Sequence, residues 1–185
     1  MKFFKYSLYK RILDIVFSVV CLFIFAIPLL FLGIIIKVTS EGPVLYKSER
    51  SGKYNRKFKM LKLRTMTVNT PQLSSKHLSN PEKYLIKFGK VLRKTGLDEL
   101  PQLYNILKGE MSFVGPRPVI SDDDELLNLR ISIDIDKLIP GLTGLAQING
   151  RSNLTVEEKI RLEHEYLNNF SFLQDIKIII LTNFY

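Results

Sequence analysis

The sequence LDELPQ, Leu97 to Gln102, places two acidic side chains next to each other in a chain that is otherwise basic. A carboxylate such as Asp98 can act as a covalent nucleophile, bind a metal ion or exchange a proton. Acidic residues at the start of a helix also interact favourably with its dipole, so the pair could be purely structural. The local pattern favours that structural role for Asp98 and Glu99, and a catalytic role needs support from elsewhere.

Two other motifs could supply contacts to an anion. In VGPRPV, Arg117 lies between two prolines, which restrict the backbone and hold it extended. Such stiffness indicates a fixed anion contact for this guanidinium. The segment PGLTGLAQINGR, Pro140 to Arg151, is rich in glycine and could let backbone amides approach an anionic ligand closely. The glycine pattern alone is not specific.

A basic segment, VLYKSERSGKYNRKFKMLKLRTM, reads as two short strands around a Ser-Gly-Lys turn. Alternation along the second strand puts Lys62 and Arg64 on the same face, where two cations could grip a phosphate. The alternative is a solvated basic hairpin that rests on anionic lipid headgroups. Composition alone does not choose between them.

The composition sets limits on the function. Lys and Arg total 27 of the 185 residues against 18 for Asp and Glu, which gives a net charge of +9 and favours anionic partners. The single cysteine, Cys21, excludes a disulfide framework or a Cys-based zinc site within the chain. The length of the chain fits one domain. The cysteine content fits a domain that faces the reducing cytosol.

The uncharged run from Ile15 to Ile36 is long enough to enter a membrane. Basic residues flank it on both sides, so both ends are expected on the cytoplasmic side. A helix that enters, breaks at Pro28 and returns satisfies this condition, because proline removes a helical hydrogen bond. We therefore expect a re-entrant helix-break-helix, with an ordinary kinked span as the alternative.

The rim of this segment carries Lys10 and Arg11 one helical turn before Asp14, close enough to pair. This trio is expected to form an interfacial anchor. The fold class is then a membrane-associated α+β protein with a re-entrant anchor over residues 1–40. A mainly helical cytoplasmic catalytic domain with a small β-hairpin follows over residues 41–185. Its last helix, after Ser171, could lie in the interface or pack under the domain.

Several motifs together resemble the bacterial sugar transferase family, the small monotopic phosphoglycosyl transferases. The resemblance covers nearly the whole chain except residues 67–82 and the acidic stretch after Val119. The chain departs from the family pattern at Ser48, Gly96 and Val156, which affects the expected sugar specificity. The matching segments are KRILD, GPVLY, FKMLKLRTM, LRKTGLDELPQLYNILKGEMSFVGPRP, PGLTGLAQINGR and SFLQDIKIIILT.

The resemblance implies transfer of a sugar-1-phosphate from a UDP-sugar to undecaprenyl phosphate, with release of UMP. It assigns Asp98 as the nucleophile that forms a covalent phosphosugar intermediate and as a ligand of Mg²⁺. Glu99 is the second catalytic residue, and it could assist metal binding, orient the nucleophile or move a proton. The helix start is expected to help keep Asp98 ionised. The residues expected to bind substrate phosphates are Arg93, Arg117, Arg151, Lys62 and Arg64.

The expected location is the cytoplasmic face of the bacterial inner membrane, in contact with membrane lipids and in association with downstream glycosyltransferases. No nucleic-acid partner is expected, because aromatic residues are not interleaved with the basic ones. Two alternatives remain from the sequence: a membrane-tethered protein that binds anionic lipid or nucleic acid without chemistry, and an inactive paralogue that acts as a scaffold. Release of UMP would distinguish the enzyme from both.

Overall fold

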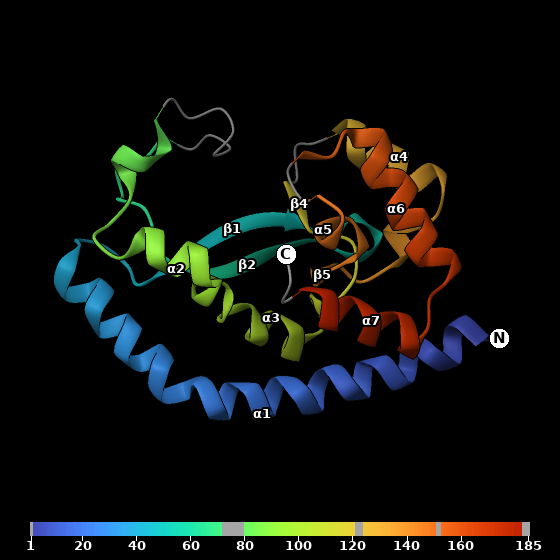
Figure 1. Cartoon of the computed structure of the whole chain (residues 1–185), viewed down its shortest axis with the longest axis horizontal. Coiled ribbons are helices and arrows are strands. Elements are labelled where there is room, and N and C mark those ends of the chain that lie inside the picture. The colour runs from blue at the N-terminus through green and yellow to red at the C-terminus, as the bar shows by residue number, and fades with distance from the viewer. Residues whose placement is uncertain (1, 72–79, 121–123, 151–152, 183–185) are drawn as a thin grey trace.

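The computed structural model describes residues 2–71, 80–120, 124–150 and 153–182. Figure 1 shows one long helix, α1, running beneath a smaller body in which helices surround two small sheets. The α-helices are α1 (Lys2–Thr39), α2 (Gly89–Thr95), α3 (Gln102–Lys108), α4 (Asp124–Ser132), α5 (Leu145–Ile148), α6 (Val156–Asn168) and α7 (Phe172–Thr182). The strands are β1 (Leu45–Ser51), β2 (Lys57–Leu63), β3 (Ser112–Val114), β4 (Val119–Ile120) and β5 (Gly141–Thr143). The short 3₁₀ helices are η1 (Lys53–Asn55), η2 (Pro81–Tyr84), η3 (Leu97–Glu99) and η4 (Ile135–Lys137).

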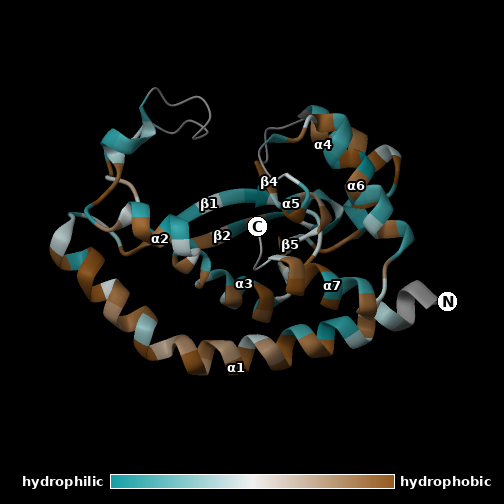
Figure 2. Cartoon of the chain, viewed as in Figure 1, coloured by the Kyte–Doolittle hydropathy of each residue, from teal (hydrophilic) through white to brown (hydrophobic). Residues whose placement is uncertain are grey.

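Helix α1 continues through Pro28, so the break expected at this residue does not occur. A proline removes one hydrogen bond but leaves the turns on either side able to continue, and Figure 1 shows a bend rather than a gap. Most of its apolar side chains face outward: Phe23 is 85% exposed and Ile27 is 80% exposed. Figure 2 shows most of the α1 ribbon in the brown of apolar residues. The re-entrant course stays a prediction.

Among the described residues, α1 is the one helix long and apolar enough to cross a membrane by length and composition. A core helix of the same composition would be buried, whereas very little of this apolar stretch is covered by the protein. The exposed apolar surface is therefore compatible with membrane association.

The predicted hairpin is confirmed. Strands β1 and β2 pair antiparallel along their whole length, from Leu45 opposite Leu63 to Ser51 opposite Lys57. The connection contains Tyr54 and Asn55, both at φ 55°, which closes the turn between the strands. Strand β4 pairs with the other edge of β1, so the sheet order is β2-β1-β4. A second, parallel pair joins β3 to β5.

The buried side chains form three clusters in the described part of the chain. The first joins the hairpin to α3 and the middle of α1 through Phe58, Met60, Leu103, Ile106 and Met111. The second lies between the β3–β5 pair and helices α5 to α7, and contains Val114, Leu138, Ile148, Tyr166 and Ile178. The third packs the C-terminal part of α1 against β2 and α2 through Ile36, Leu63, Ile86 and Leu92.

Polar contacts fasten the N-terminal half of α1 to the domain. The expected pairing of Asp14 with Lys10 and Arg11 is wrong. Lys10 forms a salt bridge with Asp175 of α7, and Arg11 donates to the carbonyls of residues 106 and 107 at 2.5 and 2.7 Å. Asp14 accepts from the amide of Phe113 at 3.2 Å. The trio therefore anchors the helix to the protein, because tertiary partners are closer than those one turn away.

Asp175 is the hub of these contacts. Its carboxylate is 5% exposed and accepts hydrogen bonds from the hydroxyls of Tyr6 and Tyr166, each at 2.6 Å, in addition to the Lys10 ammonium. Burial and the Asp175 charge raise the pKa of Tyr166 well above its usual range, so this phenol remains a proton donor. One carboxylate thus joins α1, α6 and α7.

We predict that Asp175→Asn lowers the free energy of unfolding by about 3–5 kcal/mol, because it leaves the Lys10 ammonium buried without its ion-pair partner. Denaturant unfolding of the full chain in detergent micelles measures the change. Asp134→Asn is the matched control, since it removes an exposed ion pair with Lys137 and should leave stability nearly unchanged. Equal losses in the two variants would contradict a special role for Asp175.

Candidate active site

The acidic pair lies in η3, the single 3₁₀ turn between α2 and α3. Gly96 has φ 70°, the left-handed conformation that ends α2 and starts this turn, and its carbonyl accepts from the Glu99 amide at 3.0 Å. Pro101 directly precedes α3, and no side chain caps the start of this helix. The acidic pair therefore does not begin α3 itself, because Leu100 and Pro101 separate it from the first residue of that helix.

Asp98 is buried, with 6% of its surface exposed. Burial raises the pKa of its carboxyl group above the usual range, the Glu99 charge adds to this effect, and the nearby charges of Lys62 and Arg93 oppose it. The net direction of the pKa shift is upward because loss of water outweighs the opposing charges, and ionisation of Asp98 at neutral pH stays a prediction. Among the described residues no cation lies within ion-pair distance of Asp98, so its carboxylate is left available.

Glu99 has a different environment although it is the next residue. Its Oε1 atom lies 2.6 Å from the Lys62 ammonium and 3.4 Å from the Arg117 guanidinium. Burial raises the pKa of this carboxyl group, but the charges and hydrogen bonds of Lys62 and Arg117 outweigh burial and bring the pKa below its usual value. Glu99 is therefore a fixed, ionised carboxylate beside a more easily protonated one.

The register of β2 explains the position of Lys62. Phe58 and Met60 are buried against α3, and Lys62 continues the same alternation, so it points to the side where the acidic pair lies. Arg64 lies just beyond the end of the strand at Leu63.

The structure places Arg64 away from the pair. Its side chain is 4% exposed and donates to the backbone carbonyls of Ser40 and Glu41 after the end of α1. Lys62 and Arg64 are thus not brought together as predicted, because strand alternation stops at the strand end. The Arg64 guanidinium is engaged by its hydrogen bonds to these carbonyls. The same hydrogen bonds attach the C-terminal end of α1 to the hairpin.

Arg117 is presented by a braced loop. Its flanking prolines restrict the backbone, and its carbonyl accepts from Arg130 at 3.0 Å. Arg130 is itself fixed by a buried salt bridge to Glu163 of α6, with an N···O distance of 2.5 Å. The side chain of Arg117 is 53% exposed, so the guanidinium is positioned at the backbone and accessible at its end.

Arg93 and Arg151 are the two remaining residues predicted to contact substrate phosphates. The Nε atom of Arg93 donates to the Thr65 hydroxyl at 2.9 Å, which places this guanidinium near Asp98. Thr65 was not identified from the sequence. Arg151 lies outside the described residues, and its contact stays a prediction.

The glycines of the PGLTGLAQINGR segment allow close backbone packing. A Cβ atom on Gly141 would lie 2.1 Å from the amide nitrogen of Gly115, and one on Gly144 would lie 2.1 Å from the Gly115 carbonyl oxygen. A side chain at either position would overlap the loop that precedes Arg117. The observed neighbour of these glycines is backbone, and anion binding by this segment stays a prediction.

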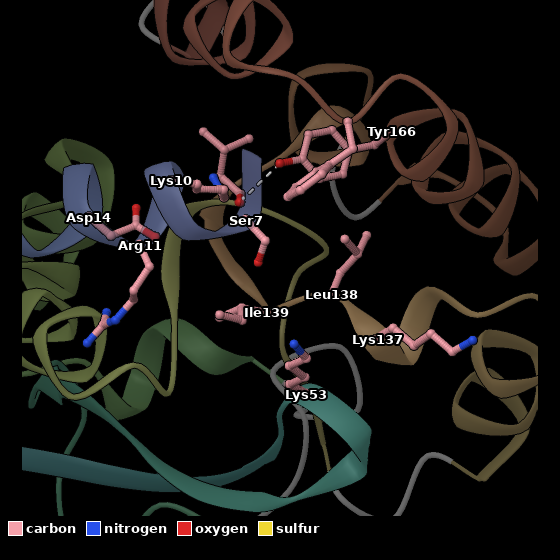
Figure 3. Close-up of a pocket in the computed structure, with 11 residues that line it drawn as sticks. Ser7, Lys10, Arg11, Asp14, Lys53, Lys137, Leu138, Ile139 and Tyr166 are labelled. Carbon is pink, nitrogen blue, oxygen red and sulfur yellow. Dashed lines mark hydrogen bonds between the residues drawn. The ribbon is translucent and has the colours of Figure 1, made fainter. Parts of the chain in front are cut away.

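A separate hollow lies between the N-terminal part of α1, η1 and η4 (Figure 3). Lys10, Lys53 and Tyr166 contribute to its lining, and neither acidic residue of η3 does. Figure 3 shows the Lys137 side chain extending away from the others. This hollow is distinct from the acidic pair and adds no carboxylate to it.

The arrangement combines an available buried carboxylate with fixed cations. Asp98 could attack an electron-poor centre, and Lys62, Arg93 and Arg117 could offset negative charge that develops there. The described residues contain no group of three or more His, Cys, Asp or Glu that could hold a metal ion by themselves. Phosphate oxygens and water are further ligands that a divalent cation at Asp98 could use.

Comparisons with known proteins agree with these features. The family model described as bacterial sugar transferase matches residues 5–185. The chain is 40% identical to the galactosyl transferase CpsE of Streptococcus agalactiae over 98% of its own length and 43% of that protein. It is 38% identical to the uncharacterized sugar transferase EpsL of Bacillus subtilis, over 94% of this chain and 84% of that one.

A third relative has a more specific name. The UDP-N-acetylgalactosamine-undecaprenyl-phosphate N-acetylgalactosaminephosphotransferase of Aeromonas hydrophila is 35% identical over 96% of this chain and 43% of its own length. The chain therefore spans less than half of some relatives and most of another. The match over nearly all of this chain shows that it belongs to the bacterial sugar transferase family.

Proposed function

We propose that this protein transfers a sugar-1-phosphate from a UDP-sugar to undecaprenyl phosphate and releases UMP. The observation that carries the proposal is the contrast within the acidic pair: Asp98 is buried without an ion pair among the described residues, whereas Lys62 and Arg117 bind Glu99. Family membership and the name of the Aeromonas relative supply the substrate class.

The reaction proceeds in two displacements. A carboxylate oxygen of Asp98 attacks the sugar-bearing phosphorus, a new P–O bond forms, and the bond to the bridging oxygen breaks so that UMP leaves with the electron pair. An oxygen of undecaprenyl phosphate then attacks the same phosphorus, and the Asp98 carboxylate is released. The product carries the sugar on a lipid diphosphate.

The surrounding cations supply electrostatic stabilisation in the proposed reaction. Negative charge on the phosphoryl oxygens increases during each displacement, and Lys62, Arg93 and Arg117 can offset it without rearrangement. Glu99 fixes the positions of Lys62 and Arg117 through its ion pairs. Its role in this proposal is therefore to position the two cations.

Mg²⁺ is proposed as the cofactor, with Asp98 as its protein ligand. One carboxylate together with substrate phosphate oxygens and water is a common donor set for this ion, and the available Asp98 carboxylate fits it. When bound, the ion would supply additional positive charge at the diphosphate. The two oxygens of the carboxylate make the ligand and nucleophile roles compatible.

The proposed location at the membrane rests on the charges that flank α1. Basic residues flank the apolar part of α1 on both sides, which favours a cytoplasmic location for both ends and for the domain over residues 41–185. A re-entrant α1 at the bacterial inner membrane would satisfy this. A UDP-sugar is water-soluble and undecaprenyl phosphate is a lipid, so a domain attached to one leaflet can reach both.

The direct experiment incubates the full chain in nanodiscs with undecaprenyl phosphate, Mg²⁺ and a panel of UDP-sugars, and measures UMP release. Release with at least one sugar is the expected result. Salt-dependent vesicle binding without UMP release from any sugar would instead support a membrane-tethered binding protein.

We predict that Asp98→Asn lowers UMP release by about a thousandfold or more and abolishes the covalent phosphosugar adduct, because an amide cannot replace the carboxylate nucleophile. Intact-mass measurement after acid quenching detects the adduct. Asp134→Asn, an exposed acidic residue, is the control and should keep both signals. A persistent adduct in the Asp98 variant would show that another residue is the nucleophile.

A second prediction concerns pH. Because the pKa of Asp98 is raised, the first displacement should gain rate as pH rises through that value and lose it below. Lys62→Met removes a positive charge that lowers this pKa, so the acid limb of the rate profile should move to higher pH.

Lys59→Met on the same strand is the matched control, since Lys59 is exposed on the opposite face of β2. The rate of UMP release from pre-bound donor, measured across pH, tests the shift. An unchanged acid limb in Lys62→Met, with the rate lowered equally at every pH, would contradict electrostatic control of Asp98.

A further inference from the structure

Arg50 lies on the same side of the hairpin as the acidic pair. In the β1–β2 register, Arg50 is opposite Phe58 and Tyr46 is opposite Lys62, and residues paired across antiparallel strands project to the same face. Phe58 packs against α3, and Lys62 contacts Glu99. The register therefore directs Arg50 toward the face that carries the candidate active site.

The neighbours of Arg50 place its charged group between this face and the braced loop. Its guanidinium is close enough to Arg117 and Tyr46 for both to affect its pKa, which burial and the Arg117 charge bring below the usual value. Strand β4, which follows Arg117 and Pro118, pairs with β1 at Arg50 itself. The loop and the strand are thus joined where the two arginines meet.

No acidic residue compensates Arg50 within the described residues. It forms no ion pair there, and its buried Nε atom has no hydrogen-bond partner. Arg117 cannot relieve the repulsion, because it shares the single Glu99 carboxylate with Lys62. A half-buried guanidinium beside a second one is unfavourable unless an anion completes the pair.

We propose that Arg50 and Arg117 form a two-arginine clamp that binds a substrate phosphate group next to Glu99 of the acidic pair. This inference rests on the proposed function and adds a residue to it. Lys62 and Arg117 share the single Glu99 carboxylate, and Arg50 adds a third positive charge beside Arg117, so a phosphate would restore the balance of charge. Guanidinium groups suit this ligand because their planar forks match phosphate oxygens.

The same phosphate chemistry occurs in the diphosphate of the UDP-sugar and in the headgroup of undecaprenyl phosphate. The test therefore uses the full chain in nanodiscs in two arms. The donor arm measures the affinity for UDP and for inorganic pyrophosphate by calorimetry. The acceptor arm measures the rate at which undecaprenyl phosphate discharges the preformed phosphosugar adduct, as a function of acceptor concentration.

Arg50→Gln should weaken binding in one of these arms by about tenfold or more, since it removes charge-assisted hydrogen bonds to a phosphate. Arg50→Lys should recover part of that loss, because it keeps the charge and lacks the planar fork. Arg56→Gln is the matched control: this exposed arginine lies in the turn of the same hairpin, and its loss should leave both arms unchanged.

Thermal unfolding separates a ligand contact from a structural one. Because Arg50 is close to a like charge and lacks a partner among the described residues, Arg50→Gln should keep or raise the melting temperature. A lower melting temperature with unchanged affinity in both arms would overturn the clamp. If the wild type binds pyrophosphate through Arg50 but releases no UMP from any sugar, the clamp stands and the proposed transferase reaction fails.

Discussion

The attachment of α1 to the domain is the constraint on which the rest of the structure depends. The outer surface of α1 is apolar and faces away from the domain. The position of the helix must therefore be fixed by specific contacts on its inner side. Arg11 provides one by donating to the carbonyls of Ile106 and Leu107 near the end of α3. Because η3 immediately precedes α3, this contact also fixes the segment that carries the acidic pair.

The acidic pair depends in turn on how charge is shared around it. Adjacent carboxylates repel each other, and Glu99 alone of the two forms ion pairs, with Lys62 and Arg117. Asp98 then lies in a buried environment where its protonation costs less than usual. In the proposed reaction, an incoming phosphate would meet Lys62 and Arg93, the cations that favour the ionised form of Asp98. Substrate binding and the protonation of Asp98 would then be coupled through the same side chains.

The sequence predicted the elements better than their partners. The hairpin is confirmed, because it depends on local alternation and turn residues. The errors arise where tertiary contacts decide. Spacing of one turn suggested partners for Asp14, yet the amide of Phe113, far along the chain, is the observed donor. Burial, which sets the direction of the Asp98 pKa, is not visible in a local pattern.

Arg50, the residue proposed for the clamp, illustrates how such a candidate is missed in a sequence and how it could be found. In the sequence it is one of many basic residues in a hairpin, and none of them stands out. Alternation along β1 together with the register to β2 would have placed it on the face of Lys62. The register, however, follows from the length of the turn and its left-handed residues, which the sequence suggested only approximately.

The outer surface of α7 bears on the question of how deep the domain lies. Its inner side is fixed by Asp175 and Ile178, whereas Leu173 and Ile180 are exposed on the other side. Figure 1 shows α7 next to the N-terminal half of α1, whose exposed side is also apolar. An apolar helix surface beside a membrane-compatible helix is stabilised by contact with the same lipid. If that contact forms, the domain rests on the leaflet through two helices, which would restrict its rocking and keep Asp98 at a constant height above the lipid acceptor.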